Sequence, residues 1–199
     1  MNVKIDKGMT KEIMIDGVPV LFRADASIPR LYRIHFGRDV FADMGELIKQ
    51  VAPNKNVEEI AKQNPEELEK SVDFGEMNTE ALENIAYIMA YHADRENTAD
   101  NIEDWLAQFG IMSLVSVLPQ ILELWGINTQ STSDVKKKER PIDREINTAL
   151  FLLRCTQMGL NMTDLSLLTI GMVSDMIIES LNDSYDYPSL AVQADFDAF

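Results

Sequence analysis

Residues 101–125 read NIEDWLAQFGIMSLVSVLPQILELW, and this stretch predicts two consecutive helices. Asn101 is a suitable N-cap for the first helix, and Gly110 ends it. From Ile111 to Trp125 the chain is apolar on most sides, a pattern typical of a helix buried in a core or against a partner. The uncharged part of this stretch is shorter than the ~18 residues of a membrane span.

A β-hairpin is predicted upstream, between Ile13 and Phe22. Apolar and polar residues alternate on both sides of Asp16-Gly17. Asp-Gly between alternating runs is a strong hairpin signal, because both central turn positions need a positive φ. Pro19 indicates that its strand lies at a sheet edge. Since a two-stranded hairpin is marginally stable alone, we expect it to pack on the helices.

Other apolar stripes predict further helices, so we expect a mainly α-helical fold opened by a short hairpin. Ser27 is a candidate N-cap for a helix that ends near Gly37. Asp39 is a candidate N-cap for the next helix, which runs to Val51. Residues 54–77 are polar and weakly periodic. The remaining predicted helices span roughly 79–92, 143–158 and a stretch that follows Thr169.

The composition changes after Gly126. Residues 127–141 read INTQSTSDVKKKERP, which is rich in small polar residues and lysine, a composition typical of a linker. We therefore predict a helical domain over 1–126, a flexible linker over 127–142, and a partly ordered helical segment with an acidic aromatic tail over 143–199. This last segment has few large apolar side chains, so alone it would be marginally stable.

The 199-residue chain carries 18 basic and 33 acidic side chains, which give a formal net charge of −15. Nucleic acids and anionic lipids are bound mainly through Lys and Arg. The charge therefore argues against nucleic acid or a membrane surface as the main partner. The lysine run at residues 136–138 is better explained by a solvated linker than by a phosphate site. A basic protein surface is a suitable partner, because opposite charge speeds encounter.

The sequence offers little for catalysis or for binding a metal or cofactor, and we predict none of the three. The single cysteine, Cys155, excludes an internal disulfide and a cysteine-rich metal site. A small hydrolase that uses Cys155 with His35 or His92 is the enzymatic alternative, but all three side chains fit helical core positions better. The acidic turn at residues 94–104 lacks the order of a calcium loop, so helix capping explains it better.

Taken in order, these features resemble the tail assembly chaperones of long-tailed bacteriophages, the G/GT pair of Gram-positive phages and prophages. Residues 31–47, LYRIHFGRDVFADMGEL, are similar to the family's helix–Gly–Asp–helix passage. Residues 101–125 are similar to its acidic-Trp-Leu helix and the apolar helix that follows, and residues 154–181 look like its T-type segment. In the family a ribosomal frameshift near an A-rich codon run adds this second part, and the lysines at 136–138 can be encoded by such a run.

The resemblance implies a non-enzymatic chaperone that works in the host cytoplasm and is not expected in the mature virion. Its N-terminal part would coat the tape measure protein, with possible self-association along it. Its T-type part would recruit tail tube subunits, whose polymerisation displaces the chaperone. The alternative within phage assembly is a structural connector or tail-terminator protein, a class that usually has more β structure.

Methionine and aromatic side chains suit adaptable binding surfaces, although core packing explains such residues equally well. For the surface that faces the tape measure protein, we predict Trp105, Leu106, Ile121 and Trp125. For the surface that faces the tube protein, we predict Met158, Leu165, Met172, Met176, Tyr185, Tyr187 and Phe199.

Overall fold

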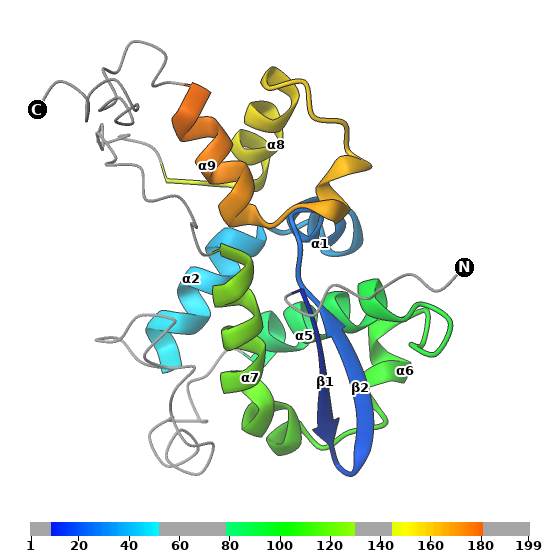
Figure 1. The fold of residues 1–199 in the computed structure, drawn as a ribbon. Helices are drawn as coiled ribbons and strands as arrows, with labels where there is room; N and C mark the ends of the chain where they lie inside the picture. Colours follow the sequence, from blue (N-terminus) through cyan, green and yellow to red (C-terminus); the bar gives the residue numbers. More distant parts are fainter. Residues whose placement is uncertain (1–8, 52–78, 130–144, 181–199) are drawn as a thin grey trace, which may run out of the picture.

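The structure is a computed structural model that describes residues 9–51, 79–129 and 145–180. The described part is mostly helical, with one antiparallel hairpin near its start, which confirms the predicted fold class. Helices α8 and α9 lie at one end of the molecule, near α1 and α2, and the hairpin turn lies at the other end (Figure 1). The helices are α1 (Ile28–Phe36), α2 (Val40–Val51), α5 (Thr79–Ala93), α6 (Ile102–Leu106), α7 (Ile111–Thr129), α8 (Thr148–Gln157) and α9 (Ile170–Ser180).

The hairpin consists of β1 (Thr10–Ile15) and β2 (Val18–Arg23), joined by the predicted Asp-Gly turn. Asp16 and Gly17 both have positive φ, at 50° and 80°, as a two-residue hairpin loop requires. Ile13 pairs with Val20 in the register, and both are buried on the face that packs against α5 and α7. Burial of this face supplies the support that an isolated hairpin lacks.

Several predicted helix caps are confirmed, and one is wrong. The Asn101 side chain accepts a hydrogen bond from Asp104 N at 2.8 Å, and the Asp39 carboxylate accepts one from Phe41 N at 3.1 Å. Ser27 does not cap α1, because its hydroxyl donates instead to the Asp25 carboxylate at 2.5 Å. This deviation is a first sign that Asp25 organises its surroundings.

Helix α7 lies in the core, and it does not end at Gly126 as predicted but continues to Thr129. A glycine inside a helix costs only about 1 kcal/mol, and the extra turn places Asn128 in the core, 1% exposed. By length and composition α7 is the one described helix that would suffice to cross a membrane, yet 56% of that stretch is buried inside the protein. Its packing on β1, α5 and α9 accounts for its apolar composition.

The C-terminal helices share one hydrophobic core with the N-terminal part. Phe151 and Cys155 of α8 and Val173 of α9 are at most 1% exposed and belong to the same buried cluster as the hairpin, α5 and α7. Backbone atoms also join the two parts, because Ala26 N donates to Leu168 O at 2.8 Å. The division into two domains stays a prediction, since residues 130–144 lie outside the described part.

The helix predicted from residue 143 begins later, at Thr148. Asn147 is its N-cap, and its side-chain oxygen accepts a hydrogen bond from Leu150 N at 2.9 Å. Residues 145–147 are therefore non-helical and lead into α8 beside α2.

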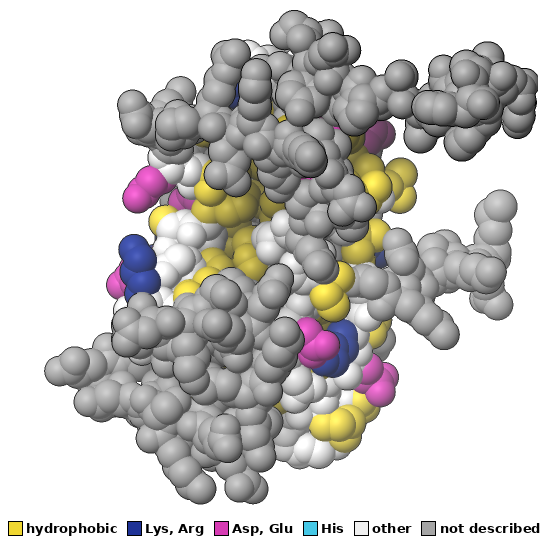
Figure 2. Space-filling model, turned by 60° about the vertical axis from the view of Figure 1, so that its left-hand side comes forward, with side chains coloured by type: hydrophobic (Ala, Val, Ile, Leu, Met, Phe, Trp, Pro, Cys, Tyr) yellow, Lys and Arg dark blue, Asp and Glu magenta, His cyan; other side chains and the backbone are white. Residues whose placement is uncertain are grey.

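Viewed from the side where α2 and α9 lie, the molecule shows hydrophobic side chains that gather in the upper centre of this face (Figure 2).

Candidate functional site

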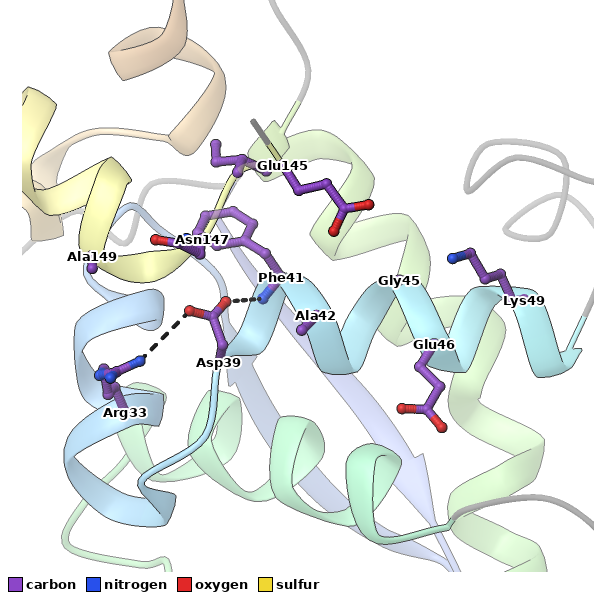
Figure 3. A pocket seen from close by; sticks show the side chains of 11 residues that line it. Arg33, Asp39, Phe41, Ala42, Gly45, Glu46, Lys49, Glu145, Asn147 and Ala149 are labelled. Atoms are coloured by element: carbon purple, nitrogen blue, oxygen red, sulfur yellow. Dashed lines mark hydrogen bonds and ion pairs between the residues drawn. The ribbon is translucent and has the colours of Figure 1, made fainter. Parts of the chain in front are cut away.

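A groove of about 810 Å³ lies between α2 and the residues that lead into α8 (Figure 3). Its two walls are about a hundred residues apart in the chain. Both walls contribute apolar and charged side chains, and α1 contributes one arginine. The lining residues are Arg33, Asp39, Phe41, Ala42, Gly45, Glu46, Lys49, Glu145, Ile146, Asn147 and Ala149.

Asp39 fixes the two walls relative to each other. One carboxylate oxygen caps α2 by accepting from Phe41 N at 3.1 Å, and the other accepts from Thr148 N, in the first turn of α8, at 2.7 Å. The Arg33 guanidinium lies 3.7 Å from the same carboxylate (Figure 3). A single aspartate thus satisfies N–H groups at the starts of two helices, which have no partner within their own helix.

Aromatic packing supports one end of the groove, and small residues leave space along α2. The Phe41 ring lies against Trp125 and Phe151, with ring centroids 6.3 and 5.8 Å apart. Ala42 and Gly45 follow on the same face of α2. Among the described residues, a Cβ atom added at Gly45 would meet no atom outside the backbone of α2 within 4 Å. This space lies directly over the helix backbone, as a groove for an inserted side chain requires.

The rim of the groove carries both signs of charge. Lys49 extends from α2, and Glu145 extends from the opposite wall (Figure 3). Within the described residues, neither is joined to a partner by an ion pair. Glu46 accepts a hydrogen bond from Gln50 Nε2 at 3.1 Å.

A second polar cluster is buried around Asp25, which is fully shielded from solvent. Its carboxylate contacts Arg23 Nε at 2.6 Å and His92 Nε2 at 2.7 Å and accepts from Ser27 N at 2.9 Å. Burial opposes ionisation, but the hydrogen bond and charge of His92 and the hydrogen bonds of Ser27 and Arg23 outweigh it. The pKa of Asp25 therefore lies below its ordinary value.

Serine, histidine and aspartate meet in this cluster, but their arrangement differs from a catalytic triad. The Ser27 hydroxyl lies 3.3 Å from His92 Nε2, and Asp25 contacts the same nitrogen. In a triad the acid and the nucleophile contact opposite nitrogens of the imidazole. The cluster instead joins β2 to the C-terminal part, since Arg23 Nη2 also donates to Ser166 O at 2.5 Å.

A third cluster joins α1 to α2. The buried Asp43 carboxylate accepts from Tyr32 Oη at 2.5 Å and is held by Arg38 through Nε at 2.7 Å and Nη2 at 2.8 Å. Burial alone would raise the pKa of Asp43, but the hydrogen bonds from Arg38 and Tyr32 have the larger opposite effect. The pKa of Asp43 therefore lies below its ordinary value. Burial and the Asp43 charge raise the pKa of Tyr32. These pairings hold the end of α1 against α2.

The residues predicted to face the tape measure protein lie mainly in the core. Trp105, Ile121 and Trp125 are 2%, 0% and 4% exposed, and Leu106 is partly buried. They do not form one surface, because Trp105 packs on Tyr87 while Trp125 packs on Phe41. Of the two roles that the sequence left open for them, the structure places the three buried residues in the core. Their contact with a partner stays a prediction.

The residues predicted to face the tube protein are divided. Met172 and Met176 are 42% and 39% exposed and lie one turn apart on α9, whereas Leu165 is fully buried and Met158 is partly buried. Tyr185, Tyr187 and Phe199 lie outside the described residues. The structure therefore brings two of the predicted side chains together on a solvent-exposed helix face.

The residues of the enzymatic and metal alternatives lie in structural positions. Cys155 is fully buried, and burial raises the pKa of its thiol to about 11. The His35 ring lies among aromatic rings, 5.2 Å from that of Tyr91. In the acidic turn, Asp94 accepts from Asn97 N, and Asn101 caps α6. Among the described residues no group of three or more His, Cys, Asp or Glu side chains is placed to hold a metal ion.

Two features escaped the sequence reasoning: the groove and the cluster around Asp25. Both depend on contacts between residues far apart in the chain, and no short motif signals either of them.

Searches against protein families, curated proteins and solved structures gave no match to this chain.

Proposed function

We propose that this protein is a non-enzymatic tail assembly chaperone of a bacteriophage or prophage, which holds the tape measure protein in the host cytoplasm and recruits tail tube subunits. The observation that carries the proposal is the pair of exposed methionines on α9, Met172 and Met176. The opposite side of α9 is anchored in the core through Ile170 and Val173. A rigidly held helix with exposed, adaptable side chains suits a surface that must bind and later release a partner.

Three further observations support a binding role over the alternatives. Cys155 is a buried thiol with a raised pKa, which disfavours the thiolate that a cysteine hydrolase needs. His92 is held by Asp25 and His35 by aromatic rings, so both histidines have structural roles. The only strands among the described residues form one hairpin, which favours a chaperone over a connector or tail terminator.

The test is co-expression of the full chain with the tape measure and tail tube proteins encoded beside it. Because the two parts of the chain share a core, point variants of the full chain are more informative than truncations. The double variant M172E/M176E places two charges on the exposed face of α9, and M14E is the matched control, since Met14 is 56% exposed on the hairpin.

We expect the wild type and M14E to co-purify with the tube protein and the double variant to lose it, while all three retain the tape measure protein. Capture of neither protein by the wild type contradicts the proposed function. Equal capture of the tube protein by all three chains contradicts the assignment of α9 as its surface.

A further inference from the structure

We propose that the groove between α2 and the start of α8 binds two turns of an amphipathic helix from another protein, whose apolar stripe is flanked by an acidic and a basic side chain. This inference goes beyond the proposed function, because it assigns a site and a class of ligand that do not depend on which partner supplies the helix.

The length and the lining of the groove fit a second helix. Phe41, Ala42, Gly45, Glu46 and Lys49 recur at spacings of one and three residues and therefore lie on one face of α2. At 1.5 Å per residue this face is about 12 Å long, which matches two turns of a second helix. Small residues at the contact let helix backbones approach closely.

Gly45 leaves a depression in the groove. Among the residues that the structure describes, a Cβ atom there would meet no atom outside the backbone of α2 within 4 Å, and the backbone of Gly45 lies within α2 without a positive φ. Helix propensity therefore favours almost any other residue at this position, by about 0.5–1 kcal/mol for alanine. A glycine at an unstrained helical site preserves a depression, into which an apolar side chain of a partner fits.

The charges at the rim of the groove indicate which kind of molecule binds there. Lys49 and Glu145 present opposite charges from opposite walls of the groove (Figure 3). A helix that passes between them pairs with both when its apolar stripe carries an acid on the edge that faces Lys49 and a base on the edge that faces Glu145. A second copy of this chain is disfavoured, because each copy has a net charge of −15. Nucleic acid is disfavoured for the same reason.

The experiment uses the full chain and a fluorescein-labelled synthetic helix of about 14 residues, stapled by a lactam. The peptide carries two leucines at i and i+4, flanked by one Glu and one Lys. Fluorescence anisotropy gives its Kd for the wild type, for G45L, which fills the depression, and for G45A, which leaves it largely open. Thermal unfolding of the three chains is measured in parallel.

We expect the wild type and G45A to bind with similar Kd, and G45L to bind about tenfold more weakly or worse. A peptide with Gln in place of both charges should bind the wild type more weakly than the parent peptide. G45L should unfold at or above the temperature of the wild type, because leucine favours the helix over glycine and its Cβ meets no described atom outside the backbone of α2 within 4 Å.

Four results overturn the inference, three from binding and thermal unfolding and the fourth from sedimentation. The first is absence of binding to the wild type, and the second is equal binding by G45L and G45A. The third is a Tm of G45L well below that of G45A, since it would mean that the chain's own residues fill the groove. Sedimentation of the wild type and G45L adds a further check: a dimer that G45L abolishes would assign the groove to a second copy. Each of these results leaves the co-expression test of the proposed function independent.

Discussion

The side-chain oxygen of Asn128, near the end of α7, accepts a hydrogen bond at 3.1 Å from the backbone N–H of Ile170, at the start of α9. The amide nitrogen of the same residue donates to the backbone oxygen of Asp25 at 3.3 Å. Asn128 is 1% exposed, so water cannot replace these bonds. One buried amide therefore ties the exit of the hairpin to the C-terminal helices.

Replacing Asn128 by alanine should lower the free energy of unfolding by about 2–3 kcal/mol, because it leaves the buried N–H of Ile170 without a partner. It also removes one of the two hydrogen bonds to the backbone oxygen of Asp25, which keeps the bond from Ile28 N. Urea denaturation followed by circular dichroism measures this change. The control is T129A. Among the described residues, the Thr129 hydroxyl bonds only to carbonyls of its own helix, and we expect a change within about 0.5 kcal/mol. Equal, small changes in both variants would contradict the linking role of Asn128.

The Asp25 cluster predicts a pH dependence with a definite sign. The pKa of Asp25 is lowered in the folded state, so its ionised form contributes stability above the unfolded-state pKa of about 3.9, and this contribution is lost as the pH falls through the folded-state value. D25N should therefore be less stable than the wild type by about 3 kcal/mol at pH 5.5.

The difference between the wild type and D25N should narrow by pH 3, which urea midpoints at the two pH values would show. The Asp43 carboxylate, whose pKa is also lowered, is present in both chains and cancels in the comparison. A difference that is independent of pH would show that Asp25 acts only through its shape.

Thr148 offers a test by stabilisation. Its hydroxyl is buried at the start of α8 and has no hydrogen-bond partner among the described residues. T148V removes this polar atom and retains the backbone bond from Thr148 N to Asp39, so the free energy of unfolding should rise by about 1 kcal/mol. T169V is the matched control and should lose about 1 kcal/mol, because the Thr169 hydroxyl caps α9 by accepting from Met172 N. Destabilisation of T148V would mean that its hydroxyl has a partner.

Cys155 is the single thiol of the chain, so its reactivity reports directly on local burial. At pH 8 the folded chain should react with Ellman's reagent on the order of 100-fold more slowly than the chain in 6 M urea, because the thiol is inaccessible and its pKa is raised to about 11. Absorbance of the released thiolate gives both rates. Equal rates would contradict the burial of α8 and would restore Cys155 as a candidate nucleophile.

The hairpin and most helices were predictable because their signals are local. Asp16-Gly17 determines its own turn, and Asn101 caps a helix that starts at the next residue. The sequence places Asn128 in a linker, because Gly126 precedes it and polar residues follow. The Asn128 side chain is buried between α9 and the end of the hairpin, and its hydrogen bonds compensate the free energy that a glycine inside a helix costs. The local sequence does not reveal this contact.

The groove could not be predicted for a related reason. Asp39 and Thr148 are 109 positions apart, and nothing in either neighbourhood specifies the other. For Trp105 and Trp125 the sequence predicts one shared surface, because both are tryptophans on neighbouring helices. In the structure they pack in separate aromatic clusters. Composition indicates which side chains are buried, but only the packing of helices indicates which of them meet.

The proposed chaperone function is tested most directly by the soluble fraction of the tape measure protein when it is expressed with and without the full chain. We expect the tape measure protein to be mostly insoluble alone and mostly soluble with the chain, and both proteins to elute together on size exclusion. An unchanged soluble fraction, with the two proteins eluting separately, would contradict the proposed function.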